Sequence, residues 1–367
     1  MRIGIDGSRA FIKNRTGIEE YSYQVIKALR DYLPEEQVVL YVRKNQVVDF
    51  QLPKNWKVKI IRFPRYWTQL GLSLEMFLHP IGVLFIPAHT IPLIHPKKVI
   101  VVIHGLEYEF CPSSYSLWDR IYMRVSIKNS CRWASRIVSV SDNTKKDLKN
   151  LYGVSNEKMK VIYEGYDSVI SNQKLVINNT VKEKVSYKLQ VTGYLLFIGR
   201  IEERKNVSNI VKAFEILKEK YQIPHKLVLA GKPGFGYQAI RIQISNSEYQ
   251  SEIIELGYVK EEEKWELLKS ADVFVFPTLY EGFGIPILEA QSVGCSVVAS
   301  NNSSIPEVVD GSALLVDCLN AEDIAENVYK ILSNETLKSD IIAKGCENVK
   351  RFSWEKCAKE ISSLLLK

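Results

Sequence analysis

The chain has 367 residues, of which 46% are hydrophobic and 25% charged, and its formal net charge is +7. This length exceeds one typical domain and suits two, and the composition is that of a globular chain without low-complexity tracts. The charge is uneven, since residues 1–170 hold 25 Lys/Arg against 16 Asp/Glu, whereas residues 171–367 hold 24 against 26. We therefore expect an anionic partner to meet the N-terminal half.

We expect neither a targeting segment nor a membrane-spanning segment in this sequence. It begins with the strand pattern MRIGID, without the apolar region of a signal peptide. The longest apolar stretch, near Ile81–Ile94, is interrupted by Pro87 and Pro92 and is too short to span a bilayer. The 6 cysteines form no C-x-x-C pair and the 5 histidines show no metal-ligand spacing, so we expect reduced thiols and no structural metal. These features predict a cytoplasmic protein.

Strands alternate with helices through the first half of the chain. The predicted strands are Arg2–Asp6, Val38–Val42, Val58–Ile61, Val83–Ile86, Val99–Ile103, Ile137–Ser141 and Lys160–Ile162. The predicted helices are Gly17–Leu33 and Asn143–Leu151. Continuous β-branched runs such as VIVVI are typical of strands buried on both faces of a parallel sheet.

The same alternation repeats after a polar stretch. Residues 169–190 are rich in Asn, Lys and Ser and predict a linker between a domain of residues 1–168 and one of residues 191–352. The predicted strands are Tyr194–Ile198, Lys226–Ala230, Glu252–Leu256, Val273–Phe276, Ser296–Ala299 and Ala313–Val316. The predicted helices are Val207–Tyr221, Glu261–Ser270, Ile285–Val293, Glu322–Ser333 and Leu337–Arg351. Two parallel α/β domains result, with a cleft between them as the expected ligand site.

Residues Pro277–Ala290 (PTLYEGFGIPILEA) combine a strand end, two glycines and two acids. The strand ends at Pro277, and Pro286 begins a helix, a position that proline favours. Glycines ahead of a helix leave backbone N–H groups accessible to an anion. Glu281 on the loop and Glu289 in the predicted first turn can face one site. The alternative is a glycine turn with incidental acids, but a carboxylate at the end of a buried strand favours a site.

Two other loops follow predicted strands. In FIGRIEERKN (Phe197–Asn206), Arg200 and Lys205 flank a charged loop ahead of a helix, where cations suit a diphosphate. A solvated loop is the alternative. The segment GKPGFG (Gly231–Gly236) lacks the G-x-G-x-x-G spacing of a dinucleotide fingerprint and the acid that follows it, so we interpret it as a turn.

Two features of the first half have open interpretations. His104 follows the strand VIVVI and is either a site residue or a structural histidine. Five basic residues recur at intervals of four, and on a helix they form one stripe, which is either a solvated face or a surface for anionic lipid headgroups or a phosphorylated acceptor. They are Arg120, Arg124, Lys128, Arg132 and Arg136, with Trp118, Ile121, Tyr122, Val125 and Trp133 around them.

Together these segments resemble glycosyltransferase family 4, whose members are retaining enzymes with the GT-B fold. EGFGIPILE is similar to the E-x7-E hallmark of that family, and GRIEERKN is similar to its Arg/Lys phosphate clamp. VVIHGLEYEF resembles the stretch with the active-site His, although Gly105 replaces the usual Asp, and TGIEEY stands at the Gly-rich loop with only Gly17. SRIVSVSDNTKKDL, LGYV, IPEVVDG and FSWEKCAKEI also resemble family segments, in the family's order.

The resemblance implies two Rossmann-like domains facing across a cleft, with residues 353–367 returning as a helix to the N-terminal domain. Arg200 and Lys205 would bind the donor diphosphate, and Glu289 the ribose. The remaining implied site residues are Glu281 beside the sugar, Gly282, Phe283 and Gly284 near its hydroxyls or the phosphates, Tyr258 and Val259 at the base, His104 facing the sugar, and Gly17 at the acceptor or a phosphate. No D-x-D occurs, so no metal cofactor is expected.

The implied function is transfer of a hexose such as mannose, glucose or rhamnose from a GDP- or UDP-sugar to a glycan or lipid-linked acceptor. Polysaccharide biosynthesis is the expected context, in the cytoplasm or peripherally at the inner face of the membrane, with no nucleic acid as partner. Fixed cations stabilise the departing diphosphate more in the transition state than in the ground state. A sugar-nucleotide epimerase and a non-catalytic scaffold of the same architecture stay open as alternatives, whereas the missing fingerprint disfavours a dehydrogenase.

Overall fold

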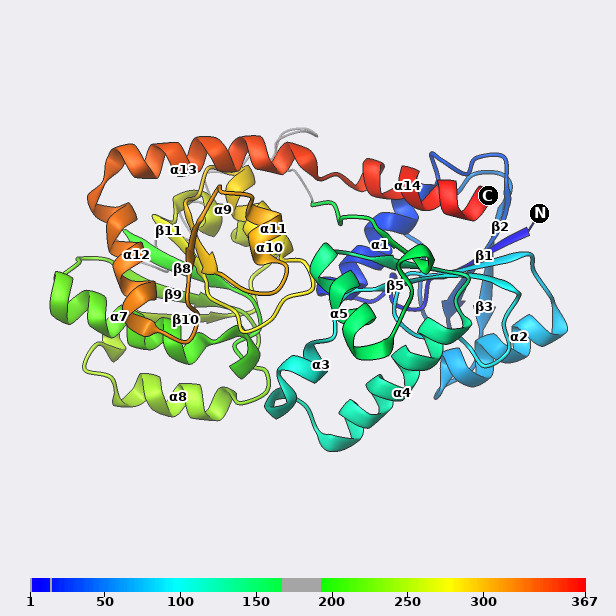
Figure 1. Ribbon diagram of the computed structural model, residues 1–367, viewed down its shortest axis with the longest axis horizontal. Helices are drawn as coiled ribbons and strands as arrows, with labels where there is room; N and C mark the ends of the chain where they lie inside the picture. The colour runs from blue at the N-terminus through cyan, green and yellow to red at the C-terminus, as the bar shows by residue number, and fades with distance from the viewer. Residues whose placement is uncertain (1, 14, 167–192) are drawn as a thin grey trace. The chain divides into compact units, whose positions relative to one another are not determined.

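A computed structural model describes residues 2–13, 15–166 and 193–367, and the chain divides into two compact units (Figure 1). Unit 1 comprises Met1–Leu106, Leu117–Gly165 and Phe352–Lys367, and unit 2 comprises Glu107–Ser116 and Tyr166–Arg351. The short segment Glu107–Ser116 therefore groups with the second unit, where Phe110 stacks on Tyr280 with ring centroids 4.7 Å apart. The linker expected at residues 169–190 lies outside the described residues.

Unit 1 is built on a parallel sheet which, in the described residues, has seven strands in the order β3-β2-β1-β4-β5-β6-β7. The strands are β1 Arg2–Asp6, β2 Gln37–Arg43, β3 Trp56–Ile61, β4 Val83–Ile86, β5 Lys98–Ile103, β6 Arg136–Ser139 and β7 Met159–Val161. The chain adds strands on one side of β1 and then on the other, which is the doubly wound arrangement. All of β4 and all but the first residue of β5 are buried, as their continuous apolar runs predict.

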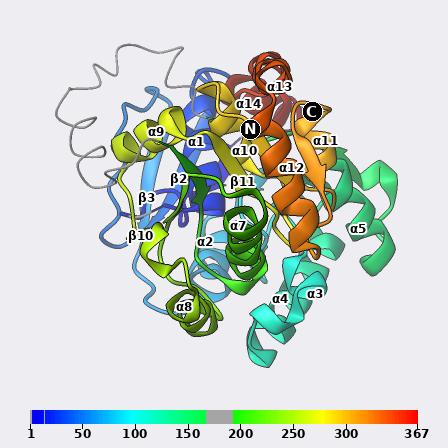
Figure 2. The ribbon, with the colours of Figure 1, turned by 90° about the vertical axis from the view of Figure 1, so that its left-hand side faces the viewer.

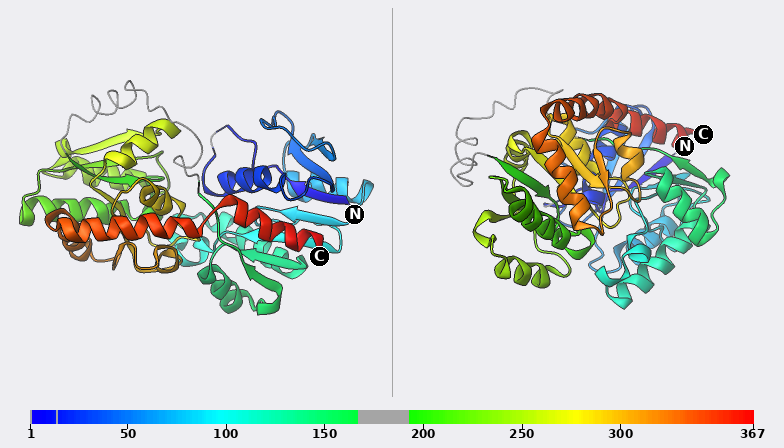
Figure 3. Two further views of the ribbon diagram at one scale, coloured as in Figure 1. Left: turned by 90° about the horizontal axis from the view of Figure 1, so that it is seen from above. Right: turned by 60° about the vertical axis from the view of Figure 1, so that its left-hand side comes forward.

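The helices of unit 1 include the last helix of the chain. They are α1 Gly17–Leu29, α2 Ser73–Leu78, α4 Leu117–Trp133, α5 Asp142–Tyr152 and α14 Trp354–Leu366. Ser353 caps α14 by accepting a hydrogen bond from the Lys356 N–H, and the helix buries an apolar face that includes Trp354 and Ile361. It lies beside α1 (Figure 3), which confirms the return of the C-terminal helix to the N-terminal domain.

Unit 2 repeats the design with a parallel sheet whose described strands have the order β10-β9-β8-β11-β12-β13. The strands are β8 Tyr194–Ile198, β9 Lys226–Ala230, β10 Ile253–Gly257, β11 Val273–Phe276, β12 Val297–Ser300 and β13 Leu314–Val316. The helices are α3 Glu107–Phe110, α7 Val207–Tyr221, α8 Tyr237–Asn246, α9 Glu261–Ser270, α10 Ile285–Ser292, α11 Ile305–Val309, α12 Ala321–Ser333 and α13 Glu335–Asn348. Helices α7 and α12 pack side by side (Figure 2). The two parallel α/β units confirm the expected fold class.

Several elements differ from the sequence expectation for local reasons. Helix α1 ends at Leu29 rather than Leu33, and the chain continues in turns in which the N–H groups of Tyr32 and Leu33 donate to the Leu29 carbonyl oxygen. The π-helical turn Trp67–Leu72 and helix α2 that follows it were not expected, nor was helix α8, which buries only Ile240 and Ile244. Short helices with so few buried positions give little apolar periodicity.

The basic stripe is interrupted by a change of element. Helix α4 carries the first four cations, but it ends at Trp133, so Arg136 begins strand β6 instead of continuing the stripe. Among the described residues, no helix is both long enough and apolar enough to cross a membrane.

Candidate functional site

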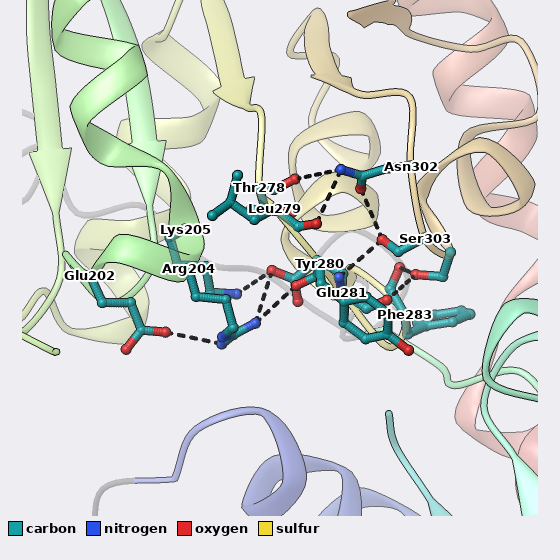
Figure 4. Close-up of polar contacts among 11 residues, drawn as sticks. Glu202, Arg204, Lys205, Thr278, Leu279, Tyr280, Glu281, Phe283, Asn302 and Ser303 are labelled. Atoms are coloured by element: carbon teal, nitrogen blue, oxygen red, sulfur yellow. Dashed lines mark hydrogen bonds and ion pairs between the residues drawn. The ribbon is translucent and has the colours of Figure 1, made fainter. Parts of the chain in front are cut away.

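A cluster of cations and carboxylates lies where the loops after β8 and β11 meet, at the carboxyl edge of the second sheet (Figure 4). Lys205 Nζ donates to Glu281 Oε1 at 2.5 Å, and Arg204 Nη1 lies 3.6 Å from the same oxygen. Arg204 also donates to Glu202 Oε1 at 3.0 Å and to the Tyr280 carbonyl oxygen at 3.1 Å. The side chains of Arg204, Lys205 and Glu281 are 11–15% exposed, so little solvent screens their charges.

The pKa values of the two cations in this cluster shift in opposite directions. Burial lowers the pKa of Lys205, an effect that the nearby Glu281 carboxylate opposes and the charge of Arg204 reinforces. Burial also disfavours the charge on Arg204, but the surrounding carboxylates, Glu281 foremost, raise its pKa above the ordinary value. An anion beside Lys205 therefore favours its charged form, and the phosphate oxygens of a diphosphate are anions of the right kind.

Asn206 fixes the cations relative to the sheet. Arg204 and Lys205 lie in a single 3-10 turn, and Asn206 follows with a φ of 60° in the left-handed region, where asparagine is more readily accommodated than most residues. Its side-chain Nδ2 donates to the carbonyl oxygens of Pro277 at 2.9 Å and Cys318 at 2.6 Å. One buried amide thus joins the loops after β8, β11 and β13.

The loop after β12 holds the backbone of the carboxylate loop (Figure 4). The Glu281 N–H donates to Ser303 Oγ at 3.0 Å, and Ser304 Oγ donates to the Phe283 carbonyl oxygen at 2.8 Å. Asn302 Nδ2 donates to the carbonyl oxygens of Thr278 and Leu279, the two residues before Tyr280. Residues 281–284 are all buried, so Glu281 is presented from a rigid backbone.

Gly284 ends this loop in a conformation that only glycine adopts readily. Its φ is 114°, and a Cβ there would lie 2.9 Å from Ile305 Cδ1. Helix α10 begins at the next residue, Ile285, and Pro286 occupies its first turn. Glu289 therefore lies in the second turn of the helix, one turn further along than we expected.

Backbone hydrogen bonds join the end of β9 and the glycine segment after it, Gly231–Gly236, to the charged loop after β8. Gly199 donates its N–H to the Ala230 carbonyl oxygen, and Ile201 donates to that of Lys232, both at 3.0 Å. A Cβ on Gly231 would collide with the Gly199 carbonyl oxygen, so the two loops approach each other more closely than side chains allow. The turn predicted at Gly231–Gly236 is thus also a support for the loop that carries Arg204 and Lys205.

Glu289 belongs to a separate ion-pair cluster. Its Oε1 accepts from Lys264 Nζ at 2.8 Å, and the same nitrogen lies 2.7 Å from Glu261 Oε1. Burial disfavours the charge on Lys264, but the two carboxylates, Glu289 first, raise its pKa. Near the end of β10, Tyr258 is 54% exposed beneath Lys232 Nζ, which lies 4.6 Å from its ring centroid, and Val259 is half-buried.

The structure thus unites only some of the predicted residues. Lys205 contacts Glu281, and Gly282, Phe283 and Gly284 lie in the same loop. Arg200 is exposed, and within the described part of the chain it makes no hydrogen bond or ion pair. Sequence reasoning missed Arg204 and Asn206, although both lie within the quoted segment FIGRIEERKN. No group of three or more His, Cys, Asp or Glu suited to a metal ion occurs among the described residues.

His104 and Gly17 lie in unit 1. His104 is buried at the end of β5, where its Nδ1 lies 2.9 Å from Glu164 Oε1 and its Nε2 lies 2.8 Å from the Pro87 carbonyl oxygen. Sequence reasoning missed Glu164, because no local motif marks it. Gly17 is the first residue of α1, and a Cβ there would meet nothing within 4 Å.

Known proteins resemble this chain in both sequence and fold. Residues 16–169 match the family model "Glycosyltransferase Family 4", and residues 182–347 match "Glycosyl transferases group 1". The chain is 30% identical over 265 residues to the O-antigen chain mannosyltransferase B of Escherichia coli, covering 72% of this chain and 69% of that one. It is 22% identical to the O-antigen chain mannosyltransferase RfbU of Salmonella typhimurium, covering 96% of each.

Solved structures with the same fold span the whole chain. Sucrose-phosphate synthase from Thermosynechococcus elongatus superposes with a TM-score of 0.77 at 17% identity, covering 100% of this chain and 98% of that one. Anabaena HepE in complex with UDP and glucose superposes with a TM-score of 0.74 at 17% identity, covering 100% and 99%. Two parallel α/β units of this kind define the GT-B fold. The chain belongs to glycosyltransferase family 4, among the group 1 enzymes.

Proposed function

We propose that this glycosyltransferase is a retaining enzyme that moves a hexose from a nucleotide-diphosphate sugar to a glycan or lipid-linked acceptor in polysaccharide biosynthesis. The buried cluster in which Arg204 and Lys205 converge on Glu281 is the main support. The O-antigen mannosyltransferases among the relatives favour mannose, and the UDP-glucose complex of HepE favours a nucleotide-sugar donor.

Charge movement explains the roles that we propose for these residues. Cleavage of the bond between sugar and phosphate passes through an oxocarbenium-like state, while negative charge grows on the departing diphosphate. Lys205, with Arg200 on the same loop, offsets that charge without a metal ion. Glu281 lies by the transferred sugar, with the backbone of Gly282, Phe283 and Gly284 near its hydroxyls or the phosphates. Glu289 binds the ribose, and Tyr258 and Val259 border the base.

Peripheral attachment to an anionic membrane is a second part of the proposal. Helix α4 exposes Trp118 by 80%, Tyr122 by 57% and Val125 by 55%, and it also presents exposed Lys128 and Arg132. Aromatic side chains beside cations suit the interface of a bilayer with anionic headgroups. A lipid-linked acceptor would be reached from that position.

A panel of nucleotide sugars tests the proposal. The full chain is incubated with GDP-mannose, UDP-glucose and other GDP-, UDP- and dTDP-hexoses, with and without glycan and lipid-linked acceptors. The release of nucleoside diphosphate and the identity of the sugar products are both measured. Transfer that preserves the anomeric configuration, or slow hydrolysis of one donor, is expected. A changed sugar on an intact nucleotide without acceptor would instead identify an epimerase, and binding without any turnover would identify a scaffold.

A further inference from the structure

Large apolar side chains are exposed together on one side of unit 1. The π-helical turn Trp67–Leu72 and helix α2 form one continuous helical stretch, in which the exposed apolar residues are spaced by four, three and one positions. This spacing places them on one face of the stretch, while Gly71, Leu72 and Met76 are buried on the other. Together with two residues of the loop after β4 they form the α2 patch, whose members are 45–66% exposed: Leu70, Leu74, Phe77, Leu78, Leu93 and Ile94.

Hydrogen bonds hold the loop of this patch between two helices. The Ile94 N–H donates to Ser73 Oγ on α2 at 3.2 Å, and the Ile91 N–H donates to Ser130 Oγ on α4 at 2.9 Å. Helices α2 and α4 cover the same face of the first sheet (Figure 1), because the chain crosses it in the same direction from β3 to β4 and from β5 to β6. The α2 patch therefore lies on the same side of unit 1 as the exposed apolar side chains of α4.

The described residues of unit 2 show no comparable patch. Its exposed large apolar side chains lie singly on separate elements, as is normal for a protein surface: Phe110, Phe235, Ile242, Tyr258 and Leu319. A contiguous exposed patch, by contrast, marks a surface that a partner or a membrane covers.

Positive charge surrounds the α2 patch. Residues 51–106 contain seven Lys/Arg and a single acidic residue, Glu75. The Glu75 side chain is 12% exposed, and its Oε1 lies 3.5 Å from Lys59 Nζ, so a cation already offsets its charge. Arg62 and Arg65 are exposed in the segment that leads into the helical stretch. The surroundings of the patch are therefore strongly cationic.

This charge decides between two possible occupants of the patch. In a symmetric contact with a second copy of the chain, the patch would face itself and bring like charges together, which opposes association. An anionic bilayer instead offers negative headgroups to the cations and an apolar interior to the exposed side chains. The combination of charge and apolar surface favours the bilayer.

We propose that the α2 patch inserts into the apolar region of an anionic bilayer, while Arg62 and Arg65 contact its headgroups. The inference rests on the membrane attachment proposed above, which it deepens by adding an inserted surface to the charged contact of α4. Tyr66, which is 71% exposed at the start of the helical stretch, lies between these cations and the patch. Tyrosine is enriched at that level of a membrane, where its ring contacts both apolar and polar groups.

The double substitution Phe77→Ser with Leu78→Ser removes two exposed members of the patch without changing the net charge. Phe235→Ser with Ile242→Ser is the matched control, since these side chains are 51% and 55% exposed in unit 2. Co-sedimentation with vesicles of phosphatidylcholine and phosphatidylglycerol measures binding, and thermal unfolding verifies that both variants fold. We expect the patch variant to bind at least about tenfold more weakly and the control to bind like the unaltered chain. Equal binding by all three chains would overturn the inference.

Tryptophan quenching measures insertion directly. Phe77→Trp adds a reporter to the patch and Phe235→Trp adds one to unit 2, and the signal of the unaltered chain is subtracted from each. In vesicles whose phosphatidylcholine carries bromine on its acyl chains, we expect the added fluorescence to be quenched at position 77 and to persist at position 235. Fluorescence that persists at position 77 while the chain is bound would show that the patch stays outside the apolar region.

Sedimentation velocity without lipid tests the second copy as occupant. A dimer of the unaltered chain that is lost in the Phe77→Ser and Leu78→Ser variant would assign the patch to self-association and overturn the inference, whereas a monomer supports it. The proposed attachment can fail separately. If the unaltered chain binds no vesicles, attachment and insertion both fail. If reversing cations of α4 abolishes binding while the patch variant binds normally, attachment stands and insertion fails. Neither result depends on donor turnover.

Discussion

Burial lowers the pKa of Lys205, and the neighbouring Glu281 carboxylate opposes that shift. If the charge of Lys205 acts on the departing diphosphate, Lys205→Ala should lower kcat by at least about 100-fold, which corresponds to roughly 3 kcal/mol of transition-state stabilisation. Initial rates under donor saturation measure the change. Lys212→Ala, an exposed lysine on α7, is the control that should leave kcat unaltered. An unaltered kcat in Lys205→Ala itself would remove the proposed role.

Arg200 and Arg204 are four positions apart and should behave differently. Arg204 is buried between Glu202 and Glu281, so Arg204→Ala leaves two carboxylates without that partner and should cost about 2–4 kcal/mol of unfolding free energy. Arg200 is exposed, so Arg200→Ala should change the unfolding free energy by less than about 0.5 kcal/mol. Urea denaturation measures both. A donor KM that rises only in Arg200→Ala would assign it to binding.

At the scale of elements, Asn206 connects three loops of the second sheet through one amide. Asn206→Gly keeps the left-handed backbone accessible but removes both hydrogen bonds, and should cost about 2 kcal/mol of unfolding free energy. Asn206→Ala removes the same bonds and adds backbone strain, so it should cost about 1 kcal/mol more. Chemical denaturation of the two variants checks the order, and equal stabilities would show that the φ of 60° carries no cost.

The strands could be predicted from the sequence because each is a short apolar run in a repeated alternation. The E-x7-E segment and Lys205 could be located because they sit where such strands end. Arg204 and Glu164 could not be assigned, since their importance comes from partners 77 and 60 positions away, Glu281 and His104. Helix α8 was missed because only two of its residues are buried. Local pattern therefore predicts the elements, while long-range pairing determines which charges meet.

The hydrogen-bond partners of His104 are a further example of this division. The sequence leaves His104 either a site residue or a structural one, and no spacing rule connects it to Glu164 on a different strand end. Only the order of the first sheet, in which β5 and β6 separate β4 from β7, brings Pro87 and Glu164 to the same ring. The sheet topology, rather than a motif, makes the pair.

At the scale of the whole molecule, the excess positive charge lies in residues 1–170. Helix α4 combines this charge with exposed aromatic side chains, so we expect the chain to bind vesicles that contain anionic lipid and to dissociate as salt is added. The double substitution Lys128→Glu and Arg132→Glu alters two exposed cations of α4. Losing two cations should weaken binding by about 30-fold, since each contributes about 1 kcal/mol near such a surface, and the reversed charges should weaken it further.

Co-sedimentation with vesicles of phosphatidylcholine, with and without phosphatidylglycerol, measures this binding. The matched control is Lys212→Glu with Lys220→Glu, which reverses two exposed charges on α7 in the other unit and changes the net charge equally. Equal loss in both double variants would mean that net charge alone drives adsorption. Binding that is insensitive to salt and to anionic lipid would contradict membrane attachment through α4, whereas selective loss in the α4 variant would locate the surface at that helix.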